Sequence, residues 1–262
     1  MNRIADAFKN NKNVFIAFVT GGDPDVETTG RIVSAMAESG ADMIVIGIPF
    51  SDTVIGGPVI KQADERALAA GCTVDKLFDT VRHVRENTEI PMLFVSYMNP
   101  IYVFGTDRFV ALCAHSGIDG LIVPDLPFEE KDELELPCRQ QGIALIPMIV
   151  PAPKERLSRI VQEAEGFLYC VSSLSLSSSG LHSEAMLGIK EMISQVKEVK
   201  DIPCAAGFEI SSPGQAWEMA AIADGVIIDN EIVRLVAQHG RDSEGPVREF
   251  VKGVREALDM QG

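Results

Sequence analysis

Short apolar runs alternate along the chain with longer segments in which apolar residues recur every three or four positions. An apolar run of four to seven residues is typical of a strand buried on both faces, and the longer period is typical of an amphipathic helix. The pattern predicts eight strands, near Val14–Val19, Met43–Gly47, Met92–Val95, Gly120–Val123, Ala144–Met148, Phe167–Val171, Pro203–Ala206 and Gly225–Ile228.

Helix-period segments lie between these strands, as in Val26–Ser39, Val74–Glu86, Asp107–Ser116 and Glu155–Glu165. An additional helix, Asn2–Asn10, is predicted before the first strand. Side chains that suit helix N-caps precede several segments, namely Asp25, Thr106 and Ser211 or Ser212. Buried strands that alternate with amphipathic helices indicate a parallel sheet covered by helices.

Eight strand–helix units in 262 residues fit one closed (β/α)8, or TIM, barrel. We therefore expect an α/β protein in which residues 1–262 form a single barrel domain with an extra N-terminal helix. An open doubly wound sheet is the alternative that the pattern allows. It is disfavoured because no G-x-G-x-x-G follows the first strand.

Composition narrows the range of partners. The net charge of −15 argues against nucleic acid, because a phosphate backbone requires clusters of Lys and Arg. No apolar run approaches the ~20 residues of a membrane span, so no membrane association is expected. The five cysteines are scattered and form no C-x-x-C pair, which suits reduced thiols in a cytoplasmic protein. No histidines show metal-ligand spacing, and no metal is expected.

One loop between a predicted strand and a predicted helix is unusually rich in Gly and Pro: Gly47-Ile48-Pro49-Phe50-Ser51-Asp52-Thr53-Val54-Ile55-Gly56-Gly57-Pro58. It resembles the signature G-[IV]-P-[FY]-S-D-P-x-A-D-G-P of the tryptophan synthase α subunit family. Four further segments resemble that family in the right order: Phe18–Pro24, Tyr97–Pro100, Gly120–Pro127 and Ala223–Ile227. The resemblance covers nearly the whole chain.

The resemblance implies a (β/α)8 barrel that cleaves indole-3-glycerol phosphate to indole and glyceraldehyde 3-phosphate. It also implies a partner β subunit that carries pyridoxal phosphate, while this chain needs no cofactor. In the family a strand-two glutamate is the acid/base and an aspartate holds the indole N–H. Those positions are Val45 and Gly56 here. Neither residue can move a proton, so we expect the family reaction to be lost.

The positions at which the family binds phosphate have also changed. They read Ser177, Ser178, Glu209, Asp229 and Asn230 here, where the resemblance leads us to expect glycine-rich loops and a serine. Glycines let the backbone approach a ligand closely, and two added carboxylates repel a dianion. We expect no phosphate in this part of the site.

Other pocket positions keep residues that resemble those around the family's indole. Together with the exchanged positions they predict an apolar pocket for a small aromatic molecule, with the lining Phe18, Val45, Ile55, Tyr97, Ile149, Tyr169, Leu176 and Phe208.

Glu209 is the candidate for a new general base, because a carboxylate with apolar neighbours becomes more basic. Such a base suits proton abstraction from an aromatic substrate, for example a Kemp-type elimination, in a barrel repurposed by engineering or selection. Asp229 competes for this role but more often acts as a helix cap.

Two other functions stay open. One is the family lyase with impaired activity, and the other is a non-catalytic binding module. The loops Thr53–Gly57 and Ser172–Ser183 correspond to those that meet the β subunit, and both differ from the family pattern. We therefore expect weak β association or none.

Overall fold

The computed structural model describes residues 2–53, 56–172, 182–207 and 210–261. Within them, nine parallel strands form one sheet in the order β5-β4-β3-β2-β1-β9-β8-β7-β6. The strands are β1 (Val14–Thr20), β2 (Met43–Gly47), β3 (Met92–Val95), β4 (Gly120–Ile122), β5 (Ala144–Leu145), β6 (Met148–Ile149), β7 (Leu168–Cys170), β8 (Cys204–Ala206) and β9 (Gly225–Ile228).

The two end strands of this order, β5 and β6, are halves of one segment that the sequence predicts as a single strand. Pro147 lies between them and has no N–H to donate to a neighbouring strand. The first half pairs with β4, and the second half pairs with β7. The Ile146 N–H still donates to the Leu121 carbonyl, and the Tyr169 N–H donates to the Pro147 carbonyl. One chain segment therefore joins both edges of the sheet, which confirms the predicted (β/α)8 barrel.

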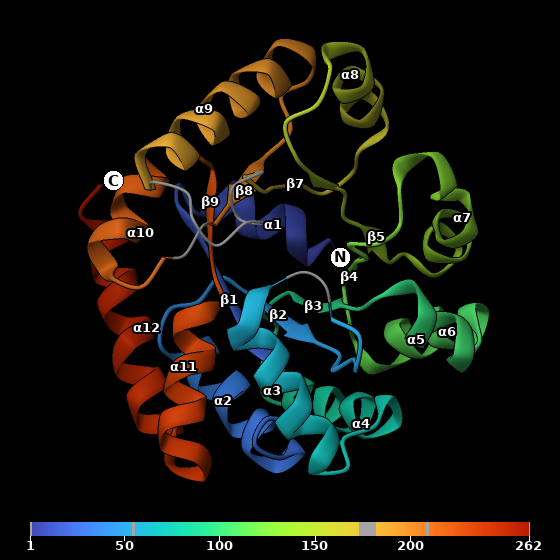
Figure 1. The fold of residues 1–262 in the computed structure, drawn as a ribbon, viewed down its shortest axis with the longest axis vertical. Helices are drawn as coiled ribbons and strands as arrows, with labels where there is room; N and C mark the ends of the chain where they lie inside the picture. The colour runs from blue at the N-terminus through green and yellow to red at the C-terminus, as the bar shows by residue number, and fades with distance from the viewer. Residues whose placement is uncertain (1, 54–55, 173–181, 208–209, 262) are drawn as a thin grey trace.

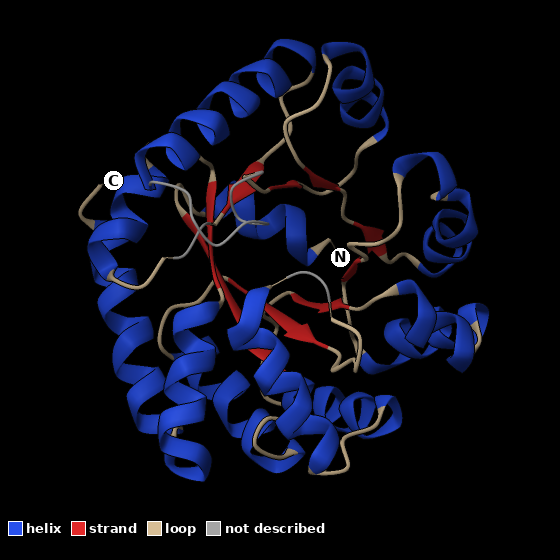
Figure 2. Cartoon of the chain, viewed as in Figure 1, coloured by secondary structure: helices blue, strands red, loops and turns tan. Residues whose placement is uncertain are grey.

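Helices surround the sheet, as Figures 1 and 2 show. They are α1 (Arg3–Asn10), α2 (Val26–Glu38), α3 (Gly57–Ala69), α4 (Val74–Arg85), α5 (Met98–Phe104), α6 (Thr106–Ser116), α7 (Asp132–Gln141), α8 (Lys154–Glu163), α9 (His182–Val199), α10 (Pro213–Ala220), α11 (Asn230–His239) and α12 (Glu244–Asp259). Short 3₁₀ turns occupy Phe128–Glu130 and Gly240–Asp242. No helix in the described ranges is long and apolar enough to cross a membrane.

The predicted N-terminal helix, α1, packs against the interior of the barrel. Ile4 belongs to the same buried cluster as the inward side chains of the strands, and the Phe8 ring lies 5.3 Å from the Phe167 ring. Arg3 anchors the helix through ion pairs with Glu89 and with Asp119, the latter just before β4. Because α1 fills the amino-terminal end of the barrel, the opposite end is left for a ligand.

Side chains alternate between two apolar layers along each strand. On β1, Ile16 and Phe18 belong to the inner cluster, whereas Phe15, Ala17 and Val19 belong to the cluster between the sheet and the helices. All seven residues of β1 are buried. This two-sided burial explains why the strands read as continuous apolar runs.

Helix caps agree with the sequence at two of three places. The Asp25 side chain accepts a hydrogen bond from Thr28 N–H at the start of α2, and Ser212 accepts one from Gln215 N–H at the start of α10. The prediction for Thr106 was wrong, because Thr106 is the first residue of α6 and Gly105 holds the cap position.

Candidate functional site

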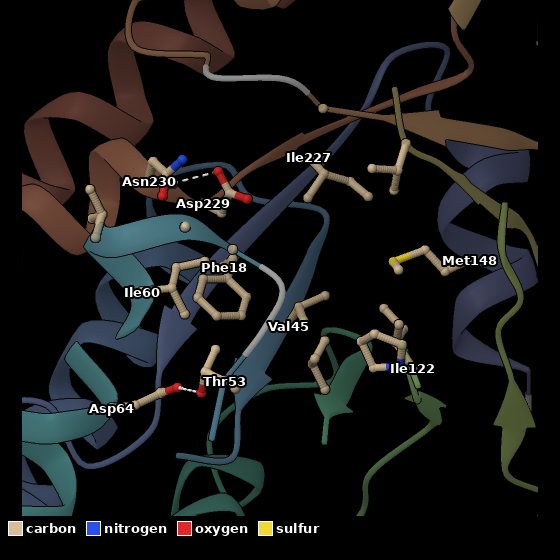
Figure 3. Close-up of a pocket in the computed structure, with 18 of the residues that line it drawn as sticks. Phe18, Val45, Thr53, Ile60, Asp64, Ile122, Met148, Ile227, Asp229 and Asn230 are labelled. Carbon is tan, nitrogen blue, oxygen red and sulfur yellow. Dashed lines mark hydrogen bonds between the residues drawn. The ribbon is translucent and has the colours of Figure 1, made fainter. Parts of the chain in front are cut away.

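A cavity of ≈ 340 Å³ opens at the carboxyl-terminal ends of the strands. Inward side chains form its walls, among them Phe18 from β1, Val45 from β2, Ile122 from β4, Met148 from β6 and Ile227 from β9 (Figure 3). The loop after β2 and the first turns of α3 and α11 form its rim. This is the end of a barrel at which the connecting loops build ligand sites.

Val45 lies deep in this cavity. It pairs in register with Phe18 across β1 and β2, and only 2% of it is exposed. The resemblance places an acid/base glutamate here, but the methyl groups of valine only extend the apolar wall. The side chain at position 45 therefore offers apolar surface to the cavity and has no proton to exchange.

Gly56 also lines the cavity, in a left-handed conformation with φ 107°. A Cβ atom added to it would lie 2.7 Å from Cδ1 of Ile60. An aspartate would therefore be strained at this position and would collide with Ile60. Gly57, with φ 69°, begins α3, and Pro58 lies in its first turn, as the sequence predicts.

Two tyrosines predicted to contact the ligand lie in the cavity lining. Tyr97 stacks at a tilt on Phe50, with 5.3 Å between ring centroids. Burial raises the pKa of Tyr169, and the negative charge of Asp229 raises it further. The Tyr169 hydroxyl therefore keeps its proton and acts as a hydrogen-bond donor.

The structure places Ile149 outside the cavity, contrary to the sequence analysis. Ile149 packs in the cluster between the sheet and the helices, and its neighbour Met148 faces the cavity instead (Figure 3). Met148 pairs in register with Tyr169, and paired residues on adjacent strands share a face. The sequence analysis assigns Tyr169 to the pocket. The register that pairs Met148 with Tyr169 would therefore have identified Met148, and not Ile149, as the pocket residue.

Asp229 and Asn230 line the rim of the cavity at the start of α11. The Asp229 side chain accepts a hydrogen bond from Asn230 N–H, so this carboxylate is the N-cap of the helix. The remaining predicted site residues lie outside the described part of the chain, namely Ile55, Leu176, Ser177, Ser178, Phe208 and Glu209.

The sequence analysis missed Asp64, a carboxylate on α3 that lines the cavity. It is only 5% exposed, and its Oδ2 accepts a short hydrogen bond from the Thr53 hydroxyl (Figure 3). Burial raises the pKa of Asp64 to about 6, although hydrogen bonds from Thr53 and the Phe50 backbone lower it, and the charge of Asp23 adds to the rise. A signal existed, because Asp64 follows Ile60 and Ala63 on the apolar face of the helix.

Two arginines lie near these carboxylates. Arg234 on α11 lines the cavity, and its Nη1 lies 3.1 Å from Glu231 Oε2. Arg66 on α3 forms two hydrogen bonds with Asp23, of 2.9 and 2.7 Å. The described lining thus combines apolar walls with two aspartates and one arginine that is already in an ion pair.

Comparisons with known proteins agree on one family. A family model described as "Tryptophan synthase alpha chain" matches residues 4–260. The chain is 42% identical to the tryptophan synthase alpha chain of Lacticaseibacillus casei over 261 residues, which are 100% of this chain and 97% of the relative. It is 41% identical to that of Lactiplantibacillus plantarum, over 99% of this chain and 97% of the relative.

Solved structures give the same result. The tryptophan synthase alpha chain of Legionella pneumophila superposes with a TM-score of 0.89 at 33% identity, covering 100% of this chain and 99% of that one. A chain of a tryptophan synthase complex from Pyrococcus furiosus superposes with a TM-score of 0.84 at 29% identity, covering 92% and 97%.

Proposed function

Since the chain belongs to the tryptophan synthase alpha chain family, we propose that its cavity binds the indole ring of an indole-3-glycerol phosphate-type substrate and cleaves it very slowly. The observation that carries this proposal is the buried Val45 in the wall of a cavity that Phe18, Tyr97 and Tyr169 line with aromatic surface. The aromatic surface supports ring binding, and a valine stands where the resemblance places the group that moves protons.

The cavity supports the binding half of the proposal. Its volume of ≈ 340 Å³ lies within the roughly 300–1,000 Å³ typical of small-molecule pockets. Phe18, Tyr97 and Tyr169 provide aromatic surface at positions that resemble the family's indole contacts. A flat bicyclic ring gains free energy there mainly by burying its apolar faces.

The slow-turnover half follows from the chemistry. Cleaving the bond between indole and glycerol requires a proton on indole C3 and the removal of a hydroxyl proton. A positioned acid/base typically contributes about 10²–10⁴-fold to such a step. Val45 cannot supply it, and the strain at Gly56 keeps an aspartate from that position.

The comparisons favour the family lyase over a repurposed or engineered proton-abstracting enzyme. The Kemp-type hypothesis depends on Glu209, which lies outside the described residues. Among the described residues, the carboxylates that line the cavity are Asp64 and Asp229.

We further propose that the chain acts as one barrel domain, residues 1–262, in the cytoplasm with a β subunit as its partner. The β subunit is suggested by the relatives, one of which was solved as a tryptophan synthase complex. Weak β association stays a prediction, because most of the rewritten loop 172–183 lies outside the described residues. All five cysteines are free and buried, which supports a reducing compartment.

The test measures indole release from indole-3-glycerol phosphate by the purified protein. We expect a rate at least about 100-fold below that of an ordinary α subunit, from the loss of one acid/base. Val45→Glu should raise the rate, and Ile122→Glu, which adds a carboxylate to another wall, should not. Release within about tenfold of an ordinary α subunit, or equal rates in the two variants, would contradict the proposal. Indole binding without turnover in any variant would make the protein a non-catalytic binding module.

A further inference from the structure

We propose that Asp64 is the polar anchor of the cavity, where its carboxylate binds the ring N–H of a flat heteroaromatic ligand and Thr53 positions it. The inference rests on the proposed function, because indole serves as the probe. It goes further by naming the residue that recognises the ligand's nitrogen, at a position to which neither the sequence pattern nor the resemblance gives a role.

Asp64 combines burial with access to the cavity. Its side chain comes from the second turn of α3, is 5% exposed and contributes to the cavity lining. Figure 3 shows it on the same side of the cavity as Phe18 and Ile60, pointing toward Thr53. A ligand stacked on Phe18 would therefore present one edge to this carboxyl group.

The Asp64 carboxylate accepts hydrogen bonds from the Thr53 hydroxyl and the Phe50 backbone, but the Thr53 donor is shared with a second acceptor. The Thr53 hydroxyl lies within hydrogen-bond distance of two acceptors, Asp64 Oδ2 and the Phe50 carbonyl oxygen, the latter at 2.8 Å. A hydroxyl has one proton to donate. The Thr53 hydroxyl, which donates to Asp64, therefore shares its proton between these two acceptors. A further N–H donor to the Asp64 carboxylate is favourable, because the Thr53 donor is shared.

The other charged groups of the described lining are already committed. Asp229 caps α11, and Arg234 pairs with Glu231. The described strand walls of the cavity are apolar apart from the Tyr169 hydroxyl. A carboxylate buried in such surroundings is costly, and a further charge-assisted hydrogen bond from a ligand N–H reduces that cost.

Burial sets the pH range in which Asp64 titrates, and the charged groups around it add smaller effects. Asp23, on the loop after β1, raises the pKa of Asp64, and Arg66 on α3 is paired with Asp23. From α11, Asp229 and Arg234 line the same cavity with opposite charges. The pKa of about 6 makes Asp64 mostly a carboxylate at pH 7.5. Indole does not titrate in this range, so its binding should weaken as the pH falls through 6.

The experiment compares indole with benzofuran, which has nearly the same shape but no N–H, by titration calorimetry at pH 7.5. We expect indole to bind about 10-fold more tightly, as for a hydrogen bond to a charged group. Asp64→Leu should reduce this ratio to about 1, while Thr53 keeps the Phe50 carbonyl as its acceptor. Asp64→Asn, which keeps the shape, should reduce the ratio by several fold. Glu65→Gln, an exposed neighbour on the same helix, should leave it unchanged.

A second readout tests Thr53 as the positioning residue. Thr53→Val removes a hydrogen bond that lowers the pKa of Asp64, so the midpoint of the pH dependence of indole binding should move to higher pH. An unchanged midpoint would refute the role of Thr53.

The possible failures are distinguishable. If indole and benzofuran bind the unmodified protein equally well, the role of Asp64 is refuted while the aromatic pocket stands. An unchanged ratio of indole affinity to benzofuran affinity in both Asp64→Leu and Asp64→Asn would also refute the role of Asp64. If neither ligand binds, the proposed function and this inference fail together.

Discussion

Asp64→Asn should flatten part of the pH dependence of the protein's stability. Burial raises the pKa of Asp64 from 3.8 to about 6 in the folded state. Between these two pH values the folded chain holds a proton that the unfolded chain has released. The resulting stability is fully present below pH 3.8 and is lost as the pH rises through about 6. Asparagine stays neutral throughout, so it cannot show this loss.

The magnitude follows from the shift. Two pKa units at about 1.36 kcal/mol each correspond to roughly 3 kcal/mol of unfolding free energy. The low exposure of Asp64, 5%, leaves little solvent to screen this effect. For a domain whose total stability is about 5–15 kcal/mol, a change of this size is readily measured.

The assay is urea unfolding of both proteins at several pH values from 4 to 7.5, followed by the fluorescence of Trp217. The other ionisable groups titrate in both proteins, so they largely cancel in the difference between the two unfolding free energies. That difference should shift by about 3 kcal/mol in favour of Asp64→Asn as the pH rises. Glu65→Gln should run parallel to the unmodified protein. Parallel curves for Asp64→Asn would refute the buried, proton-holding state of Asp64.

Four further predictions test the site. Gly56→Asp should lower the urea midpoint by an amount equivalent to about 1–2 kcal/mol, because the backbone at this position is left-handed. Adding Ile60→Ala should recover part of that loss, and a Gly56→Asp variant of unchanged stability would contradict the collision with Ile60. Glu209→Gln should remove most of any turnover of 5-nitrobenzisoxazole, and an equally fast variant would exclude Glu209 as the base. Gel filtration of the protein mixed with a β subunit should show little or no shift, so a clear shift would disprove weak association. Crystals soaked in glycerol phosphate should show no anion next to Asp229, and density there would contradict the prediction.

The fold was largely predictable because strands that are buried on both faces appear in the sequence as continuous apolar runs. Each observed strand falls within a predicted apolar run, give or take a residue at its ends. The division of the predicted strand at Pro147 could also have been predicted, since proline cannot donate a hydrogen bond within a sheet. It was missed because apolar residues continue on both sides of Pro147. Thr106 failed as a cap because Gly105 provided a backbone turn that needs no side chain.

The site was most predictable in and beside the family motifs. Phe18 and Tyr97 lie in segments that resemble those motifs, Val45 lies two residues before one, and the structure places all three in the cavity. Tyr169, which lies outside the motifs, was also predicted correctly. Ile149 lies after Pro147, where one residue of uncertainty in register moves a side chain to the other face of the sheet. Asp64 lies on a helix, and its contact with the cavity depends on how the helix packs, which periodicity alone does not give.

We expect the cavity to bind a ring in preference to a phosphate. A helix N-terminus attracts anions through its unpaired N–H groups and its dipole, and α11 begins at the cavity rim. Asp229 places its own carboxylate on that terminus and accepts a hydrogen bond from Asn230 N–H, so an incoming phosphate would meet like charge. The part of the cavity that would hold the ring has no such repulsive charge, because Phe18 and Val45 present apolar surface there. A protein that loses affinity for the phosphate while it keeps the aromatic pocket should therefore prefer indole itself to indole-3-glycerol phosphate.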